Sequence, residues 1–181
     1  MKRICKYILL LTVMAASCSC IKEKLEETYN KQEEQIDKYI TAAAEKNQNY
    51  SVSYNGGSSR LTTKAGEGPE LSADGSVSFY YAGYTFDGSI KPAALFGTNH
   101  QSTAESAGWT LTDPDYSLLE INMKSSDLLK GVRDGLIGVQ AGEECEILFS
   151  GKYGFGNSTF GMIPAKSALA FKIWVVGVSN D

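Results

Sequence analysis

The sequence of 181 residues predicts an α+β domain, with an antiparallel sheet wrapped on one short helix and a charged helix before it. Four segments have the alternating, aromatic or β-branched character of strands: 77–81, 118–123, 145–149 and 168–178. A single short helix is predicted over 130–139, with glycines near its end. The 18 glycines and 10 tyrosines are typical of a β-rich domain with many tight turns.

Residues 22–47 are highly charged and predict a helix. Sparse apolar residues recur there at helical spacing: Leu25, Tyr29, Ile36, Tyr39, Ile40 and Ala43. Favourable pairs four residues apart, such as Glu27 with Lys31, add support. We interpret this segment as a solvated helix between a membrane and the domain, and a coiled-coil partner is the alternative. Residues 47–59 form a polar break, with Gly56-Gly57 at a turn.

The N-terminus has the pattern of a secretory signal. Basic residues at 2–6 precede an apolar run, 7–16, which is too short to span a bilayer as a helix. The small residues 15–17 followed by Cys18 resemble the lipobox of bacterial lipoproteins, in which the cysteine becomes the lipid-modified N-terminus. Cys20 is the alternative lipidation site, and an ordinary cleaved signal peptide is the alternative to lipidation. All three predict an exported protein, and lipidation anchors it to a bacterial envelope membrane, on its periplasmic or surface face.

Composition excludes several classes of function. The formal net charge of −4 gives no basic footprint for nucleic acid. His100 is the only histidine, which excludes His-based triads and multi-His metal sites, and we expect it to be solvated. No metal or cofactor is predicted.

The remaining titratable residues have structural interpretations. Three of the four cysteines lie in the first 20 residues, so no disulfide framework is implied. Alternation places Cys145 with Ile147 and Phe149 on one face, as a small buried hydrophobe. The glutamates at 143, 144 and 146 are expected at a solvated strand edge.

Several segments, taken in order, resemble the FKBP-type peptidyl-prolyl isomerase family. They are Lys64-Ala65-Gly66-Glu67-Gly68-Pro69, Gly75 to Tyr84, Leu95-Phe96-Gly97-Thr98-Asn99, Leu128 to Leu136, Tyr153-Gly154-Phe155-Gly156, Gly161-Met162-Ile163-Pro164 and Leu169-Ala170-Phe171. Their order and spacing carry the resemblance, which covers roughly residues 60–178. It implies an FKBP-like antiparallel half-barrel in a domain over 59–181, after a signal peptide (1–17) and a charged helical stalk and linker (18–58).

The resemblance implies a pocket for proline-containing polypeptide segments. Residues of the expected type occupy most of its positions: Tyr81, Phe96, Leu128, Leu129, Ile163 and Phe171. Of these, Tyr81, Phe96, Ile163 and Phe171 are implied as catalytic, and the backbone N–H of Ile163 is implied to hold the peptide carbonyl. Leu128 and Leu129 are implied to bind substrate, as are Leu119, Val132 and Phe155.

Four positions depart from the family pattern. Leu119 replaces an aromatic residue, Gly97 an aspartate, Val132 a tryptophan that forms the pocket floor, and Phe155 a tyrosine that bonds the peptide. Residues 99–118, which include Trp109, form a longer segment than compact members carry and are expected as a flap over the pocket.

The resemblance implies a peptidyl-prolyl cis-trans isomerase (EC 5.2.1.8) that assists the folding of exported proteins. The departures at Gly97, Val132 and Phe155 predict reduced activity. The alternative is a non-catalytic FKBP-like peptide-binding or chaperone lipoprotein, and a purely structural lipoprotein is a third interpretation. The sequence leaves the oligomeric state open.

Overall fold

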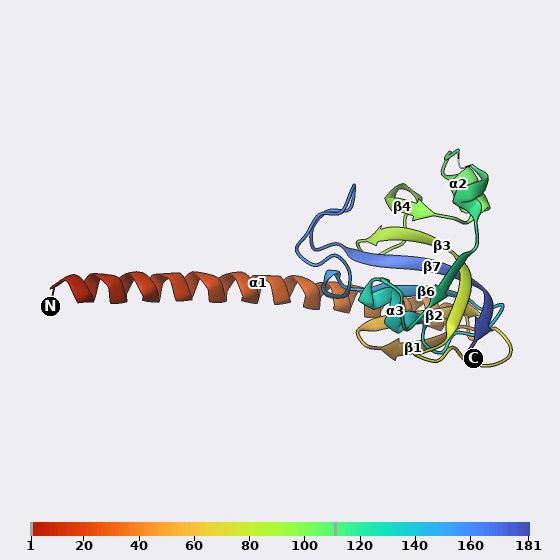
Figure 1. Ribbon diagram of the computed structural model, residues 1–181, viewed down its shortest axis with the longest axis horizontal. Helices are drawn as coiled ribbons and strands as arrows, with labels where there is room; N and C mark the ends of the chain where they lie inside the picture. Colours follow the sequence, from red (N-terminus) through yellow and green to blue (C-terminus); the bar gives the residue numbers. More distant parts are fainter. Residues whose placement is uncertain (1, 111) are drawn as a thin grey trace.

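The computed structural model describes the backbone of residues 2–110 and 112–181, and the side chains of residues 22–110, 112 and 115–181. A long helix, α1 (Lys2–Lys46), runs into a domain built on one sheet (Figure 1). The strands are β1 (Ser51–Asn55), β2 (Ser58–Lys64), β3 (Ser76–Phe86), β4 (Leu95–Thr98), β5 (Leu119–Asn122), β6 (Glu144–Phe149) and β7 (Ala168–Ser179). The shorter helices are η1 (Pro92–Ala94), α2 (Gln101–Ser106), η2 (Asp113–Tyr116), α3 (Lys130–Leu136) and η3 (Gly151–Tyr153).

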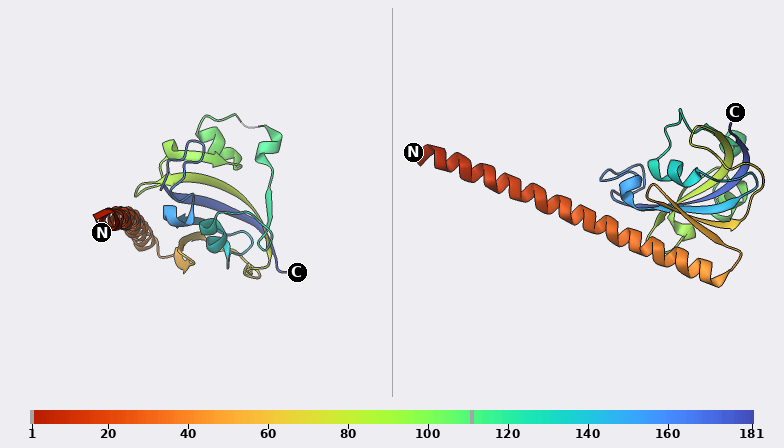
Figure 2. Two further views of the ribbon diagram at one scale, coloured as in Figure 1. Left: turned by 60° about the vertical axis from the view of Figure 1, so that its left-hand side comes forward. Right: turned by 90° about the horizontal axis from the view of Figure 1, so that it is seen from below.

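The strands form one antiparallel sheet in the order β1-β2-β6-β7-β3-β4, and β5 pairs with the first half of β3. The sheet curves around α3, as the turned views show (Figure 2). This arrangement confirms the predicted fold class. Successive residues of a strand point to opposite faces, so the sheet has an inner face toward α3 and an outer face away from it.

The main core lies between the inner face and α3. Its largest buried side chains include Phe79, Leu136, Ile147, Phe149 and Ile173. Cys145 belongs to this core, which confirms its prediction as a buried hydrophobe. Burial raises the pKa of the Cys145 thiol well above its ordinary value, because an ionised thiolate would lose its hydration.

Helix α1 packs against the outer face, where Ile36 and Ile40 are buried with Leu61, Leu148 and Ala170. The Tyr39 hydroxyl donates a 2.8 Å hydrogen bond to Glu146. The expected solvated helix is therefore wrong for this part of α1. The predicted apolar stripe is real, but the outer side chains of Leu61, Leu148 and Ala170 are also apolar, and the two apolar surfaces cover each other.

The segment expected as a linker contains strand β1, which pairs with β2 through a hairpin. Its turn is Gly56-Gly57, as predicted, and both glycines have positive φ, +58° and +96°.

The expectation of a solvated edge is wrong for Glu143 and Glu146, which are both buried. Strand β6 lies between β2 and β7 and not at an edge. Burial is tolerated because Glu143 accepts hydrogen bonds from Thr62 Oγ1 and the Gln140 N–H, at 2.9 and 3.1 Å.

The predicted lipidation sites, Cys18 and Cys20, have side chains outside the described residues. Among the helices that the structure describes, none has an apolar stretch long enough to cross a bilayer.

Candidate functional site

Three strands bring three of the predicted pocket aromatics together on the inner face: Tyr81 from β3, Phe96 from β4 and Phe171 from β7. The ring centroid of Phe171 lies 6.3 Å from that of Tyr81 and 5.7 Å from that of Phe96. The Phe96 pair meets edge to face, which is a favourable geometry for aromatic rings. Residues far apart in sequence thus form one apolar wall, as the resemblance implied.

Phe149 lies at the base of the site, and alternation in the sequence predicts only that it belongs to a buried strand face. Its fully buried ring stacks on Phe171 with a centroid distance of 5.9 Å and an interplanar angle of 13°. A Cβ atom on Gly131 would lie 2.2 Å from Phe149 Cγ, so the backbone of α3 rests directly on this ring. Next to it, Val132 is buried in the same cluster. Phe149 and Val132 thus belong to one buried cluster, and position 132 is where the resemblance implies a tryptophan.

The rim consists of half-buried residues that pack against the same cluster: Leu119, Leu128, Leu129 and Phe155. Leu129 precedes α3 as its N-cap residue and makes no side-chain cap hydrogen bond. The first N–H groups of a helix have no acceptor within the helix. Leu129 thus brings the first turn of α3 to the apolar rim.

Ile163 is buried against the cluster, but its implied hydrogen-bonding role is wrong. Its N–H donates to the Phe160 carbonyl at 2.9 Å, and the Phe160 N–H donates to the Ile163 carbonyl at 3.0 Å. These two bonds close a tight turn, so the Ile163 N–H already has an acceptor. Ile163 contributes its side chain to the wall and no donor for a peptide.

The loop between η3 and β7 presents apolar side chains beside the wall. Phe155 and Phe160 stack with centroids 4.5 Å apart and planes 5° apart. Phe160 is 61% exposed and Met162 is 75% exposed. Phe160 therefore covers one side of Phe155 and is not buried in the inner core.

The Tyr81 hydroxyl faces Gly97, where the family has an aspartate. A Cβ atom on Gly97 would lie 3.8 Å from the hydroxyl oxygen, which is an ordinary contact. Burial raises the pKa of Tyr81. Asn99 fixes the backbone of this residue, because its Oδ1 accepts the Tyr81 N–H at 2.6 Å and its amide donates to the Ser117 carbonyl at 2.9 Å. No pattern in the sequence indicates that role of Asn99.

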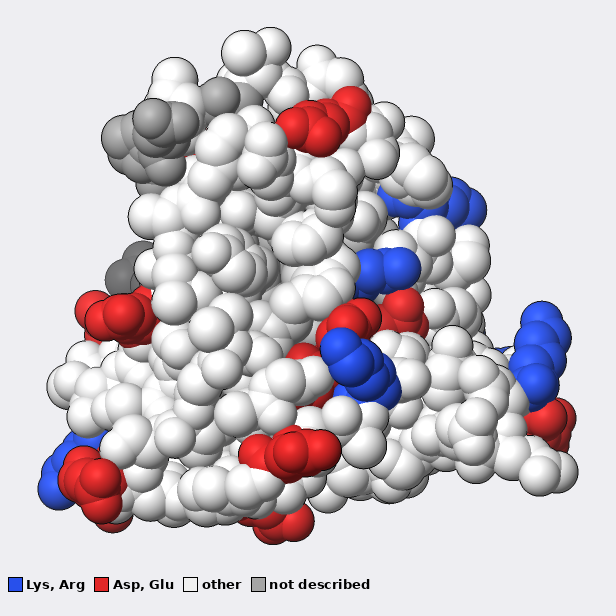
Figure 3. Space-filling model, turned by 90° about the vertical axis from the view of Figure 1, so that its right-hand side faces the viewer, with Lys and Arg blue, Asp and Glu red and all other residues white. Residues whose placement is uncertain are grey.

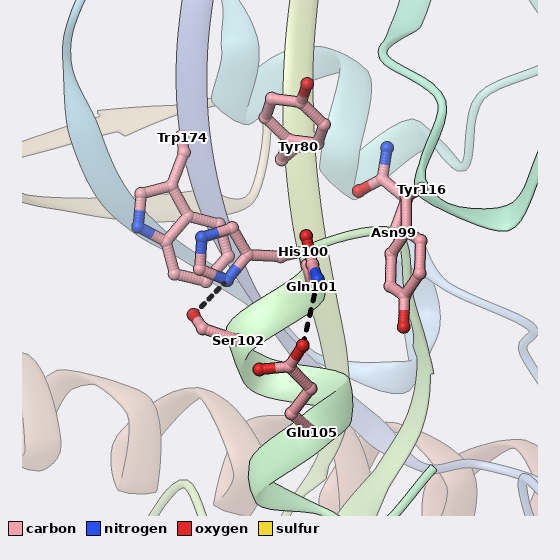
Figure 4. A pocket seen from close by; sticks show the side chains of 8 residues that line it. All are labelled: Tyr80, Asn99, His100, Gln101, Ser102, Glu105, Tyr116 and Trp174. Atoms are coloured by element: carbon pink, nitrogen blue, oxygen red, sulfur yellow. Dashed lines mark hydrogen bonds between the residues drawn. The ribbon is translucent and has the colours of Figure 1, made fainter. Parts of the chain in front are cut away.

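A second recess of about 510 Å³ lies on the outer face (Figure 4). It is lined by four ring side chains, Tyr80, His100, Tyr116 and Trp174, together with Asn99, Gln101, Ser102 and Glu105. The His100 ring stacks on Trp174 at a centroid distance of 3.8 Å. His100 is thus half-buried and not solvated as expected, and desolvation lowers its pKa.

The polar groups of this recess bond to one another. Gln101 donates to Glu105 at 2.9 Å, and the Nδ1 atom of His100 lies 3.3 Å from the Ser102 hydroxyl, as the dashed lines in Figure 4 mark. Trp109, expected on a flap over the pocket, packs instead near Tyr84 and Leu95 on the outer face. The expected flap is therefore wrong for this residue.

The charges give no further site. Within the described part of the chain, no group of three or more His, Cys, Asp or Glu side chains is placed to hold a metal ion. The face shown in Figure 3 is largely uncharged, with acidic and basic side chains scattered over it. The apolar wall of the inner face remains the site with the most specific arrangement.

Known proteins are similar to this chain in sequence. Residues 68–176 match the family model of the FKBP-type peptidyl-prolyl cis-trans isomerases. The chain is 24% identical over 123 residues to FK506-binding protein 1 of Aspergillus oryzae, covering 68% of this chain and 99% of that protein.

Solved structures of low identity share the fold. FkpA from Escherichia coli has a TM-score of 0.55 and 19% identity, over 94% of this chain and 70% of that one. A peptidyl-prolyl cis-trans isomerase from Pseudomonas syringae pv. tomato has a TM-score of 0.56 and 17% identity, over 86% and 96%. Taken with the family match, which spans more than half of the sequence, these likenesses show that the chain belongs to the FKBP-type peptidyl-prolyl cis-trans isomerase family.

Proposed function

We propose that this protein isomerises X-Pro peptide bonds in exported polypeptides, with an activity below that of family members that retain all pocket residues. The observation that carries the proposal is the convergence of Tyr81, Phe96 and Phe171 on one apolar wall. The wall is rimmed by Leu129 and Phe155, which are only half-buried and therefore present apolar surface to a ligand.

Such a wall can catalyse rotation without a nucleophile or a metal. The barrier of about 18–20 kcal/mol comes from amide resonance, which the twisted transition state loses. The twisted amide is less polar than the planar one, so transfer from water to an apolar surface costs the transition state less than the ground state. Ring faces and aliphatic side chains are suited to this task, and in the proposal the proline ring lies against Phe171.

The donor for the peptide carbonyl is assigned to the N-terminus of α3. Ile163 is unsuitable because its N–H is used within a turn. The backbone at Leu129 borders the wall, and the helix that follows has N–H groups without intrahelical acceptors. Phe155 lacks the hydroxyl that a tyrosine would offer, which removes roughly 0.5–1.5 kcal/mol of binding.

The proposed location is the bacterial envelope, with the protein anchored through a lipid on Cys18 and Cys20 as the alternative site. The support is the sequence pattern of a basic segment, a short apolar run and small residues before Cys18. Labelling cells with a radioactive fatty acid tests this proposal. We expect incorporation to be lost in Cys18→Ser and kept in Cys20→Ser; the reverse result moves the site, and no labelling of the unaltered protein refutes lipidation.

A second candidate is a non-catalytic peptide-binding or chaperone module. It is favoured by the three departures at Gly97, Val132 and Phe155, and by the exposure of Phe160 and Met162 beside the wall. An exposed phenylalanine and methionine on one loop suit adaptable apolar contacts with unfolded chains.

NMR exchange spectroscopy on a short X-Pro peptide separates the two candidates. We expect the unaltered protein to accelerate exchange, and Tyr81→Ala to remove most of the acceleration. Tyr80→Ala is the matched control, because this neighbouring tyrosine points to the outer face and lines the other recess.

Restoring the family residues gives the second arm of the test. Phe155→Tyr adds a donor worth roughly 0.5–1.5 kcal/mol, which corresponds to about a 2- to 12-fold gain in kcat/KM. Peptide binding without exchange in both the unaltered protein and the Phe155→Tyr, Gly97→Asp variant would establish the binding module and refute the isomerase. Equal losses in Tyr80→Ala and Tyr81→Ala would remove the inner wall as the site.

A further inference from the structure

We infer that Gln32 of helix α1 is a positioning residue for the proposed isomerase site, because it ties together the two ends of the loop that carries Phe155, Phe160 and Ile163. We call residues 151–166 the pocket loop. This inference rests on the proposed function for its effect on catalysis. The contact itself belongs to the structure and is tested separately below.

The side-chain amide of Gln32 bridges the start and the end of the pocket loop. Its Oε1 accepts the Gly151 N–H at 2.9 Å, and its Nε2 donates to the Lys166 carbonyl at 2.6 Å. These partners lie 119 and 134 residues away in the sequence. One amide thus satisfies two backbone groups that belong to no strand ladder.

The two loop ends are in direct backbone contact where Gln32 binds them. A Cβ atom on Gly151 would lie 2.6 Å from the Lys166 carbonyl oxygen, so only glycine fits there. Lys166 has a φ of +64°, an uncommon conformation for a residue with a side chain. Such a conformation persists when its surroundings determine it, and the Gln32 bond to the carbonyl of Lys166 is one of these constraints.

Hydrogen bonds continue from this contact into the pocket loop. The Gly156 N–H donates to the Gly151 carbonyl at 2.8 Å, and the Lys166 N–H donates to the Gly156 carbonyl at 2.7 Å. Phe155 immediately precedes Gly156, and its ring packs against both Phe160 and the inner cluster. Positions in the wall therefore depend on the geometry of the loop ends.

Other residues of α1 near Gln32 bond to residues at or just before the start of the pocket loop. Glu33 accepts a 2.9 Å hydrogen bond from the hydroxyl of the fully buried Ser150, and Glu26 pairs with Lys152 at 3.4 Å. Tyr29 is buried between these positions in the helix. In Figure 1 the blue loop before β7 lies beside α1, and the turned view in Figure 2 agrees. The helix that leads toward the predicted membrane anchor is thus bonded to the substrate side of the domain.

Gln32→Ala removes both bonds and leaves the buried residues of α1 in place. Gln35→Ala is the matched control, because it makes the same change on an exposed position of the same helix. Gln32→Glu is the conservative variant, since a carboxylate still accepts the Gly151 N–H and cannot donate to Lys166.

Amide hydrogen–deuterium exchange of the full chain measures the contact without any catalysis. We expect Gln32→Ala to speed exchange in the pocket loop roughly 2- to 10-fold while the β6 and β7 amides keep their protection, as follows from the net value of a hydrogen bond. Gln32→Glu is expected to show a smaller effect, and Gln35→Ala none. Unchanged exchange in Gln32→Ala refutes the bridging role of Gln32. A loss of protection throughout the sheet shows a role in stability alone, which also overturns the inference.

Kinetics on an X-Pro peptide test the positioning role. A loop that is less often in place lowers the fraction of competent sites, so KM is expected to rise about 2- to 10-fold in Gln32→Ala with kcat little changed. Faster loop exchange with an unaltered KM overturns the positioning role. If the unaltered protein shows no isomerisation, the proposed function fails, and the Kd of the same peptide from NMR titration then replaces KM in this comparison.

Discussion

Replacing Gly131 by alanine tests whether Phe149 forms the floor of the site. The added Cβ atom would lie 2.2 Å from Phe149 Cγ and 2.4 Å from both Cδ atoms, whereas ordinary contact begins near 3.4 Å. Helix α3 and strand β6 would have to separate by about 1 Å. Neither partner is the free end of a flexible side chain, because the Phe149 ring is fully buried.

The magnitude follows from the cost of overpacking, which is about 1–3 kcal/mol in a core. Gly131 is the second residue of α3, so the preference of alanine over glycine in helix interiors offsets little of that cost. We therefore expect Gly131→Ala to lower the free energy of unfolding by about 1–3 kcal/mol, and the Tm by roughly 2–12 °C.

Urea denaturation followed by circular dichroism measures this effect. Gly97→Ala is the control, because its Cβ atom would meet only Tyr81, at 3.8 Å, and should change stability by less than about 0.5 kcal/mol. Adding Phe149→Leu should make the loss at Gly131 smaller, with a coupling of about 0.5–3 kcal/mol. A Gly131→Ala protein as stable as the unaltered one would refute the close approach of α3 to Phe149.

Four further outcomes are expected. Ile40→Ala should cost about 2–5 kcal/mol in urea denaturation, since Ile40 is fully buried between α1 and the sheet. Cys145 should resist thiol reagents until the protein unfolds, because burial raises its pKa. Folding lowers the pKa of His100 below its ordinary value of 6.5, so the unfolded chain takes up a proton first as the pH falls. Stability should therefore fall as the pH drops below that value, and His100→Gln should remove this dependence. Gly97→Asp should raise the pKa of Tyr81 further, measured by its absorbance on alkaline titration, because a nearby carboxylate disfavours the phenolate.

Each of these has a contrary result. A small loss of stability in Ile40→Ala, equal to that of the exposed Lys38→Ala, would show that α1 is not docked. Rapid labelling of Cys145 in the native protein would place it at the surface. If stability depends on pH in the same way in His100→Gln, the dependence would belong to carboxylates. If the pKa of Tyr81 is unchanged in Gly97→Asp, the side chains at positions 81 and 97 do not interact.

Short-range patterns predicted most of the sheet, and the family resemblance predicted the inner site. Alternation alone placed Cys145 and Phe149 on a buried face, whereas the resemblance to the FKBP family implied that Tyr81, Phe96 and Phe171 lie together. Alternation and the order of the motifs can both be recognised in the sequence without knowledge of tertiary contacts.

Long-range partners could not be predicted in this way. The apolar stripe of α1 was recognised, but nothing within residues 22–47 shows that the outer face of β6 and β7 would cover it. The same holds for Glu143, whose burial depends on Thr62 and on the position of β6 within the sheet. The predicted role of Ile163 is wrong for another reason, because its N–H donates to the Phe160 carbonyl within a tight turn.

The tyrosine pair in β3 has a consequence for errors of strand pairing. Tyr80 faces outward and Tyr81 inward, just after the irregularity in β3–β7 pairing between Ser78 and Phe79. A slip of one residue exchanges the two faces of a strand and would normally replace an inward side chain by a chemically different one. In a slip that brings Tyr80 to the place of Tyr81, a phenol ring would still face inward, but Ser78 would replace Phe79 in the buried core, so the residues before the tyrosine pair hold the strand in register.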